Sequence, residues 1–170
     1  MSIADRGTEV LAMRAATEAD VPALAALWHA GWQDGHAAVV PEGLLPHRDA
    51  ASFAVRTRRH LGRIMLAERK GRLLGFYMLH DDELEQFYVA PQARGTGVAA
   101  ELMKDAERAM AKVGAVRAWL ACSVGNLRAA RFYEKCGWQR MGVEPMELEV
   151  LEGSFTLDIW RYEKDLGGGG

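Results

Sequence analysis

The spacing of apolar residues changes several times along the chain and predicts alternating strands and helices. Apolar side chains recur at every third or fourth position in some segments, which is the period of a helix with one buried face. In others they alternate or form short runs bounded by glycine, proline or charged residues, which is typical of strands. The predicted helices are 17–32, 48–62, 98–113 and 126–136. The predicted strands are 10–16, three antiparallel strands within 63–90, 116–123, and a terminal hairpin within 146–164.

Length and composition predict one globular domain. The chain has 170 residues, of which 49% are hydrophobic and 26% charged, and neither a repeat nor a linker divides it. We therefore expect a single domain at residues 1–166 and a glycine tail at 167–170. The net charge of −2 argues against a nucleic-acid partner, and no apolar run approaches the roughly 20 residues that span a bilayer. Without a recognisable secretory segment, a cytoplasmic location is expected.

The two cysteines indicate no metal site. Cys122 and Cys136 form no CxxC pair and have no paired histidines nearby, so neither a zinc site nor a disulfide framework is expected. Buried thiols are the simpler interpretation.

A glycine pair stands where a predicted strand turns into a predicted helix, in "QARGTGVAAELMKDAE", residues 92–107. The first apolar position of the helix is Val98, so the helix begins at the glycines. A helix start offers unpaired N–H groups and a positive dipole end, and glycine lets a phosphate approach closely. "RGTG" is thus a candidate pyrophosphate cradle to which Arg94 adds charge, with a plain strand-to-helix turn as the alternative.

Two other nucleotide-binding patterns fit this segment less well. A Walker P-loop needs Lys-Ser/Thr after its last glycine, where this chain has Val98-Ala99. "GTGVAA" matches the dinucleotide pattern, but "AVRAWL", about 20 residues on, lacks the acid that would bind the ribose. A nicotinamide oxidoreductase is therefore disfavoured.

Three segments together resemble the GNAT superfamily of acyl-CoA-dependent N-acyltransferases. "QARGTG" matches its Q/R-x-x-G-x-G/A signature after a "FYVAP" strand end, "NLRAARFYEKCGW" looks like its second motif, and "MRAATEADVPAL" is similar to its usual opening. The resemblance implies an α/β (α+β) GNAT fold, with a mixed, mostly antiparallel sheet of six or seven strands and about four flanking helices. It also implies an N-acetyltransferase that moves an acetyl group from acetyl-CoA to a primary amine by direct attack.

The resemblance implies a set of residues that bind acetyl-CoA. Backbone N–H groups of Phe87 and Val89, on a strand whose end splays from its neighbour, would bind the thioester and the pantetheine amides. Asn126 suits a helix N-cap and would also contact the cofactor. The complete expected set is Phe87, Val89, Gln92, Arg94, Gly95, Thr96, Gly97, Val98, Ala99, Asn126 and Tyr133.

Tyr133 and an acidic residue are the candidate catalytic groups. By resemblance the Tyr133 phenol donates to the coenzyme A sulfur, although its position on a helix stripe also suits a core aromatic. An alkylammonium must lose a proton before it attacks, and "HDDELEQ" holds several acids on the strand that faces the acceptor. Glu85 is narrowly preferred as the base over Glu83, while Asp81 and Asp82 are interpreted as a solvated turn.

The N-terminal aromatic residues and the proline-interrupted segment 36–46 are expected to line an acceptor pocket. The expected substrate-binding residues are Trp28, Trp32, His36 and Glu83, with helix packing as the alternative for the tryptophans. A small-molecule amine is the expected acceptor, and a protein N-terminus or lysine is the second possibility. A module that binds acyl-CoA without turnover remains a further alternative. Alternation in "FTLDIWRY" suits either a homodimer interface or an inner sheet face.

Overall fold

One mixed sheet of seven strands organises residues 10–167, the part of the chain that this computed structural model describes. In chain order the strands are β1 (Ala12–Ala15), β2 (Ile64–Arg69), β3 (Arg72–His80), β4 (Glu83–Val89), β5 (Arg117–Ser123), β6 (Gln139–Glu149) and β7 (Ser154–Asp165). The α-helices are α1 (Val21–Gly35), α2 (Ala50–Arg59), α3 (Val98–Lys112) and α4 (Leu127–Lys135). Short 3-10 helices are η1 (Glu18–Asp20), η2 (Glu42–His47), η3 (Leu61–Arg63) and η4 (Pro91–Ala93).

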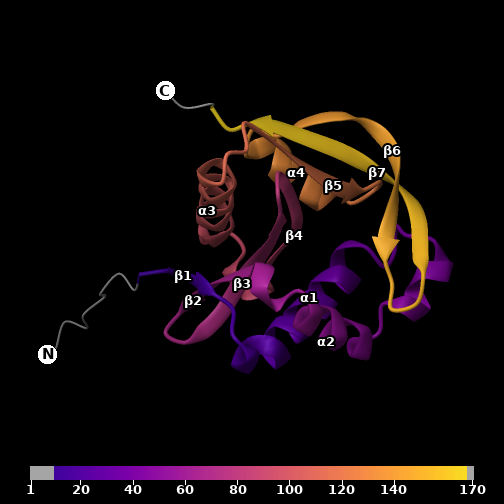
Figure 1. Cartoon of the computed structure of the whole chain (residues 1–170), viewed down its shortest axis with the longest axis horizontal. Coiled ribbons are helices and arrows are strands. Elements are labelled where there is room, and N and C mark those ends of the chain that lie inside the picture. Colours follow the sequence, from indigo (N-terminus) through magenta and orange to yellow (C-terminus); the bar gives the residue numbers. More distant parts are fainter. Residues whose placement is uncertain (1–9, 168–170) are drawn as a thin grey trace, which may run out of the picture.

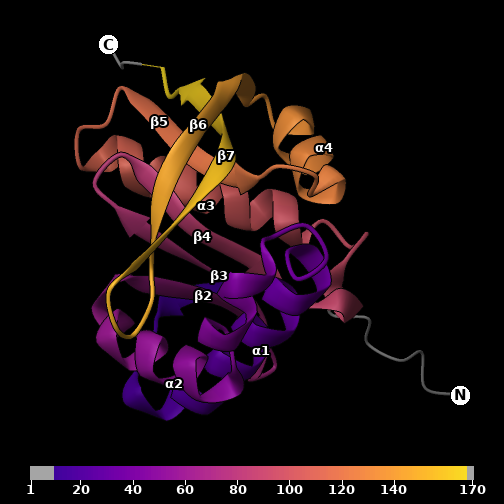
Figure 2. The same ribbon diagram turned by 90° about the vertical axis from the view of Figure 1, so that its right-hand side faces the viewer.

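The strand order is β1-β2-β3-β4-β5-β7-β6, and every neighbouring pair is antiparallel except β4 with β5. The predicted mixed, mostly antiparallel sheet is therefore confirmed. Helices α1 and α2 cover one face of the sheet, and α3 and α4 cover the other (Figures 1 and 2).

Each face of the sheet has its own hydrophobic core. On the first face, Trp28 of α1 and Phe53 of α2 pack edge to face at 5.5 Å over Phe76 of β3. On the second, Leu102 and Met110 of α3 are fully buried against the sheet. Apolar residues therefore point alternately to the two faces along the central strands, which is why those strands have nearly continuous apolar runs.

The connection between α1 and α2 contains more structure than the sequence predicts. We expected a loop at 36–46, but residues 42–47 form η2, with Pro46 inside it. Helix α2 begins after Asp49, whose carboxylate accepts a hydrogen bond from the Ser52 N–H at 2.8 Å. It ends at Arg59 rather than at Gly62, because the chain tightens into η3.

The terminal hairpin is longer than predicted, since β6 already begins at Gln139. Its tip lies beside α2 (Figure 1), where Glu149 pairs with Arg56 and Arg59. Strand β7 pairs with β5 on one edge and β6 on the other, and Leu157 and Ile159 are buried in the core of the first face. The alternation in "FTLDIWRY" is thus that of an inner sheet face and lends no support to a homodimer.

No helix among residues 10–167 is long and apolar enough to cross a bilayer. Of the predicted glycine tail at 167–170, only Gly167 belongs to the described residues.

Candidate active site

Strands β4 and β5 are neighbours at one end only. Their single register pair joins Glu83 to Trp119, and the Trp119 N–H also donates to the Asp82 carbonyl at 3.0 Å. Beyond this point no further register pair joins the two strands in the described sheet. The sheet therefore opens between the carboxyl ends of two parallel strands, as the resemblance predicts.

This opening leaves backbone donors of β4 without a strand partner. The Ala90 N–H donates to the Leu74 carbonyl on β3 at 2.8 Å, and Tyr88 lies opposite Phe76 in the same ladder. Successive N–H groups of a strand point to opposite edges, so those of Phe87 and Val89 point toward the edge that β5 has left. These two donors are available to a ligand carbonyl.

A cavity of about 360 Å³ occupies the α3 and α4 side of the opening; we call it the larger cavity. Seven of the expected acetyl-CoA-binding residues line it: Phe87, Val89, Arg94, Gly95, Ala99, Asn126 and Tyr133. The other four do not line it. Gln92 and Thr96 are exposed beside it, Gly97 caps α3, and the Val98 side chain is buried in the core, so Val98 can offer only its backbone.

The start of α3 is shaped for close approach by an anion. Gly97, the N-cap, has φ +88°, and a Cβ added to Gly95 or Gly97 would meet nothing within 4 Å. The left-handed backbone therefore favours glycine, and the space in front of it is open. The first N–H groups of a helix have no partner within the helix, so this end can hold a phosphate.

Two arginines flank this helix start and share one carboxylate. Arg94 donates to Asp34 Oδ2 at 2.8 Å, and Arg128, at the start of α4, pairs with the same oxygen. Hydrogen bonds from Arg94 and then Arg128 lower the pKa of Asp34. The two cations outnumber the anion, so the mouth of the larger cavity keeps a positive excess. Sequence reasoning missed Arg128 because it regarded α4 only as the carrier of Asn126 and Tyr133.

Tyr133 lies in the wall of the larger cavity, with its ring 5.8 Å from that of Phe132 and 5.9 Å from that of Tyr162. Burial raises the pKa of Tyr133, so the phenol stays neutral at physiological pH. No hydrogen-bond partner for its hydroxyl exists within residues 10–167, so the O–H is free to donate to a ligand. Asn126 caps α4 as predicted, accepting from the Ala129 N–H at 3.3 Å.

A second cavity of about 130 Å³ lies on the α1 and α2 side of the sheet; we call it the smaller cavity. All four expected substrate-binding residues, Trp28, Trp32, His36 and Glu83, line it. The two tryptophans also pack in the core, as the alternative interpretation expects, and their role in substrate binding stays a prediction. Burial lowers the pKa of His36 to about 4, which leaves the imidazole neutral. Its ring stacks on Trp32 at 6.1 Å.

The two cavities meet at the opening between β4 and β5. Five residues line both: His36, Glu85, Gln86, Tyr88 and Ala121. A group bound in one cavity can therefore reach a group bound in the other, through the plane of the sheet.

A bulge in β4 gives its two glutamates different surroundings. Met78 faces Gln86 but Leu79 faces Leu84, so Glu85 is the extra residue. A strand without a bulge would place Glu83, Glu85 and Phe87 on the same face of the sheet, and the extra residue breaks this alternation. Glu85 forms an ion pair with Arg63. Glu83 is only 8% exposed, and burial followed by the charge of Glu85 raises its pKa to about 7.

His80, Glu83 and Glu85 also lie close enough together to hold a cation among the described residues. No metal site was expected there from the sequence. Since Arg63 already neutralises Glu85, these three side chains offer a cation less negative charge than two free glutamates would.

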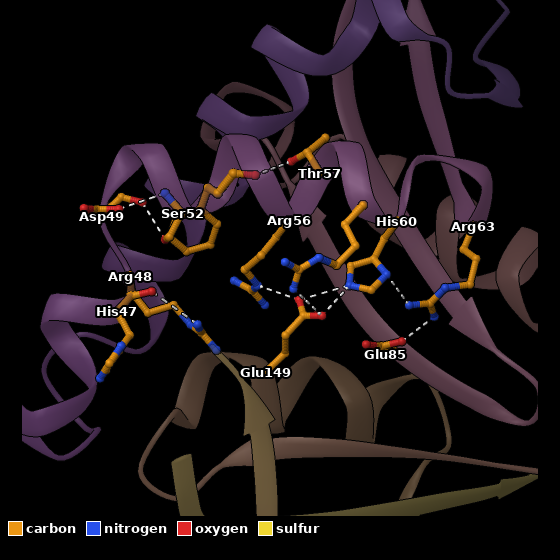
Figure 3. Close-up of polar contacts among 12 residues, drawn as sticks. His47, Arg48, Asp49, Ser52, Arg56, Thr57, His60, Arg63, Glu85 and Glu149 are labelled. Atoms are coloured by element: carbon orange, nitrogen blue, oxygen red, sulfur yellow. Dashed lines mark hydrogen bonds and ion pairs between the residues drawn. The ribbon is translucent and has the colours of Figure 1, made fainter. Parts of the chain in front are cut away.

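An ionic network links Glu85 to the terminal hairpin (Figure 3). Arg63 Nη2 donates to His60 Nδ1 at 2.8 Å, and His60 Nε2 lies 2.8 Å from Glu149. A guanidinium has no acceptor, so Nδ1 must accept and Nε2 must carry the proton. Burial would raise the pKa of Glu149, but the His60 hydrogen bond and the Arg56 charge outweigh it and hold the pKa below its usual value.

Comparison with known proteins agrees with the fold described above. Residues 23–138 match the family described as Acetyltransferase (GNAT) family. An uncharacterized N-acetyltransferase of Mycobacterium tuberculosis (strain H37Rv) is 36% identical over 120 residues, which cover 65% of this chain and 77% of that protein.

Two solved structures show the same fold. A GCN5-related N-acetyltransferase from Rhodopseudomonas palustris superposes with a TM-score of 0.70 at 23% identity, over 92% of this chain and 96% of that one. A spermidine N-acetyltransferase from Vibrio cholerae, in complex with CoA and spermine, superposes with a TM-score of 0.66 at 20% identity, over 93% and 96%.

Proposed function

The chain belongs to the GNAT acetyltransferase family, and on that premise we propose that it transfers an acetyl group from acetyl-CoA to the primary amine of a small molecule. The observation that carries the proposal is the opening between β4 and β5, where a cavity from each face of the sheet meets the other beside Tyr133. Acetyl-CoA would occupy the larger cavity and the amine the smaller one.

Binding of acetyl-CoA in the larger cavity is supported by the start of α3 and by the Vibrio relative that binds CoA. The backbone around Gly95 and Gly97 leaves room for phosphate oxygens, and the helix N–H groups would donate to them. Arg94 and Arg128 add positive charge at the same mouth. Phe87 and Val89 would donate their free N–H groups to the pantetheine and thioester carbonyls, stabilising negative charge that develops on the thioester oxygen.

Glu83 is the base that the site supports best. Its pKa of about 7 makes the carboxylate a usable proton acceptor near neutral pH. Glu85, the base preferred from sequence alone, already has a partner in its ion pair with Arg63. Glu83 would take the proton from the ammonium directly or through water.

Tyr133 would be the acid. As the amine nitrogen forms its bond to the carbonyl carbon, the carbon–sulfur bond breaks and its electron pair leaves on sulfur. The neutral Tyr133 hydroxyl, free of other partners, donates a proton to that thiolate. The ammonium loses two protons in all: Glu83 takes the first before attack and releases it to solvent, and the second leaves the nitrogen once the new bond has formed and restores the Tyr133 hydroxyl.

A small acceptor is favoured by the size of the smaller cavity, about 130 Å³, and by the buried aromatic residues around it. A protein N-terminus or lysine is the alternative acceptor, and an acyl-CoA sensor without turnover is the alternative function. A cytoplasmic location and a homodimer remain predictions.

Incubation with acetyl-CoA and a panel of primary amines tests the proposal, with free thiol and acetylated amine measured together. Thiol release that depends on a small amine, in equal amount to the acetylated product, is expected. Tight acetyl-CoA binding with no product from any amine or peptide would instead favour the sensor.

A further inference from the structure

Two arginines are buried in the wall of the smaller cavity. Arg48, between η2 and α2, is 4% exposed, and Arg56 on α2 is 5% exposed. Arginine is almost never buried to this degree unless a partner neutralises it, because desolvating a charge is costly. Each of these two guanidinium groups therefore requires a partner that compensates its charge.

Arg56 is held in place but incompletely paired. Its Nε donates to Glu149 at 3.2 Å, and its guanidinium lies 4.3 Å from the centre of the Trp28 ring. Its Nη1 is buried with no hydrogen-bond partner within residues 10–167. A rigid guanidinium with a spare N–H edge is a ready donor to an oxyanion.

Arg48 has fewer partners than Arg56. Its Nη1 donates at 3.4 Å to the backbone carbonyl of His47, and within the described chain it has no ion pair. Burial, followed by the charge of Arg56, lowers the pKa of Arg48 to about 10, so it remains charged at neutral pH. Two like charges thus share one small cavity.

The carboxylates around the cavity neutralise this pair only in part. Glu149 is shared among Arg56, Arg59 and His60, and Glu85 pairs with Arg63. Glu147 also lines the cavity, but its side chain is exposed and has no ion pair within the described chain. Figure 3 shows Arg48 toward one end of this row of charged residues, Arg56 beside Glu149 in the middle, and Glu85 toward the other end. The cavity therefore has a cationic end at Arg48 and an acidic end at β4, where Glu83 and Glu85 lie.

Building on the proposed acetyl transfer, we propose that the acceptor is a primary amine that also carries a carboxylate or a similar small oxyanion, which Arg48 and Arg56 bind. The amine would lie toward Glu83 at the opening in the sheet, and the anion toward the arginines. Trp28, Leu44 and Leu157 supply apolar wall between them, so the acceptor's carbon skeleton is apolar.

Matched sets of acceptors test this directly. We would compare L-phenylalanine with phenylalaninamide and phenethylamine, the same three forms of leucine, and ω-amino acids of increasing length with their alkylamines. For at least one set, kcat/KM of the carboxylated form is expected to exceed that of the uncharged forms by about ten- to a hundredfold. If amines without an oxyanion, including diamines, are acetylated as well or better throughout, the proposal is overturned.

Substitution of Arg48 tests whether the arginines cause the preference for a carboxylated acceptor. Arg48→Gln is expected to remove it by lowering kcat/KM for the carboxylated acceptor alone, and Arg48→Lys to restore part of it. Arg58→Gln is the control, since Arg58 is an exposed residue of α2 that pairs with Glu18 at 3.5 Å. An equal loss for both forms of the acceptor in Arg48→Gln would contradict anion binding at Arg48.

Thermal unfolding separates failure of this inference from failure of the proposed function. The same amino acids, at constant ionic strength, should raise the unfolding midpoint of wild type and Arg58→Gln more than that of Arg48→Gln. If no compound releases thiol, the acetyl-transfer proposal fails, and this shift alone decides the anion site. Equal shifts in wild type and Arg48→Gln would then overturn it.

Discussion

Glu83 of β4 lies opposite Trp119 of β5 in the one register pair that joins these parallel strands in the described sheet. The last paired residue before the opening is thus also a buried carboxylate in the wall of the smaller cavity. Pairing at this point fixes the backbone of Glu83, while separation of the strands beyond it lets the two cavities meet.

Glu83→Gln should remove a proton acceptor and change two pH dependences. In wild type, kcat/KM for the amine is expected to rise through a limb near pH 7, where Glu83 ionises, and this limb should be absent from the variant. Glu85→Gln is the comparison, since the same loss of the limb there would return the role of base to Glu85.

The free energy of unfolding of the wild-type protein should fall as pH rises, in the opposite sense to kcat/KM. The folded-state pKa of Glu83 is raised from 4.5 to about 7, so folding favours the protonated form and the free energy of unfolding falls as pH rises between those values. The shift corresponds to about 3 kcal/mol at most. Glu83→Gln should flatten this dependence and be the more stable protein at pH 8, as measured by urea unfolding. A variant that is less stable at pH 8 than at pH 4.5 by the wild-type amount would contradict the assignment.

Tyr133→Phe should lower the acetyl-transfer rate by roughly a hundredfold, because the leaving thiolate loses its proton donor. Affinity for acetyl-CoA should change little, since the ring and its contacts with Phe132 and Tyr162 remain. Stopped-flow thiol release and calorimetric titration measure the two quantities. Unchanged turnover would remove Tyr133 from the acid role.

Gly97→Ala should weaken acetyl-CoA binding about tenfold or more, because its methyl group enters the space that phosphate oxygens would occupy. Alanine at φ +88° also costs about 1 kcal/mol of backbone strain. Gly114→Ala, after the other end of α3, has φ +101° and similarly open surroundings, so it controls for strain alone. Equal acetyl-CoA affinity in the two variants would show that phosphates do not meet Gly97.

Gly31→Ala should disturb the junction of the cavities from the side of α1. A Cβ at Gly31 would lie 2.5 Å from Cδ1 of Tyr88, a residue that lines both cavities. Tyr88 must move, which is expected to cost about 1–3 kcal/mol of stability and to reduce transfer activity. Gly62→Ala has open surroundings and should change neither. Wild-type activity in Gly31→Ala would mean that the position of Tyr88 is unimportant to transfer.

Much of the fold followed from the sequence because apolar periodicity and glycine positions are local signals. The glycine pair located the start of α3, and the Asn126 cap located α4. The sequence did not predict the bulge at Glu85, because the bulge depends on how β3 pairs with β4. It is also what separates Glu83 from Glu85, so the preference between these two acids required the structure.

The charged residues of the site were the hardest part to predict. Arg48 and Arg56 lie in a segment rich in arginine, and only the tertiary packing of α2 against Trp28 and the hairpin decides which of them are buried. Asp34 likewise joins Arg94 to Arg128 through contacts between segments far apart in sequence. Sequence spacing within one helix carries no signal for such contacts.

The central claim is that acetyl-CoA and the amine occupy the two cavities at the same time and react directly. Initial rates with both substrates varied, together with the intact mass of protein incubated with acetyl-CoA alone, test it most directly. Intersecting double-reciprocal lines and an unmodified protein are predicted, since burial raises the pKa of Cys122, the thiol lining the larger cavity, to about 12. Parallel lines with an acetylated protein would contradict the account.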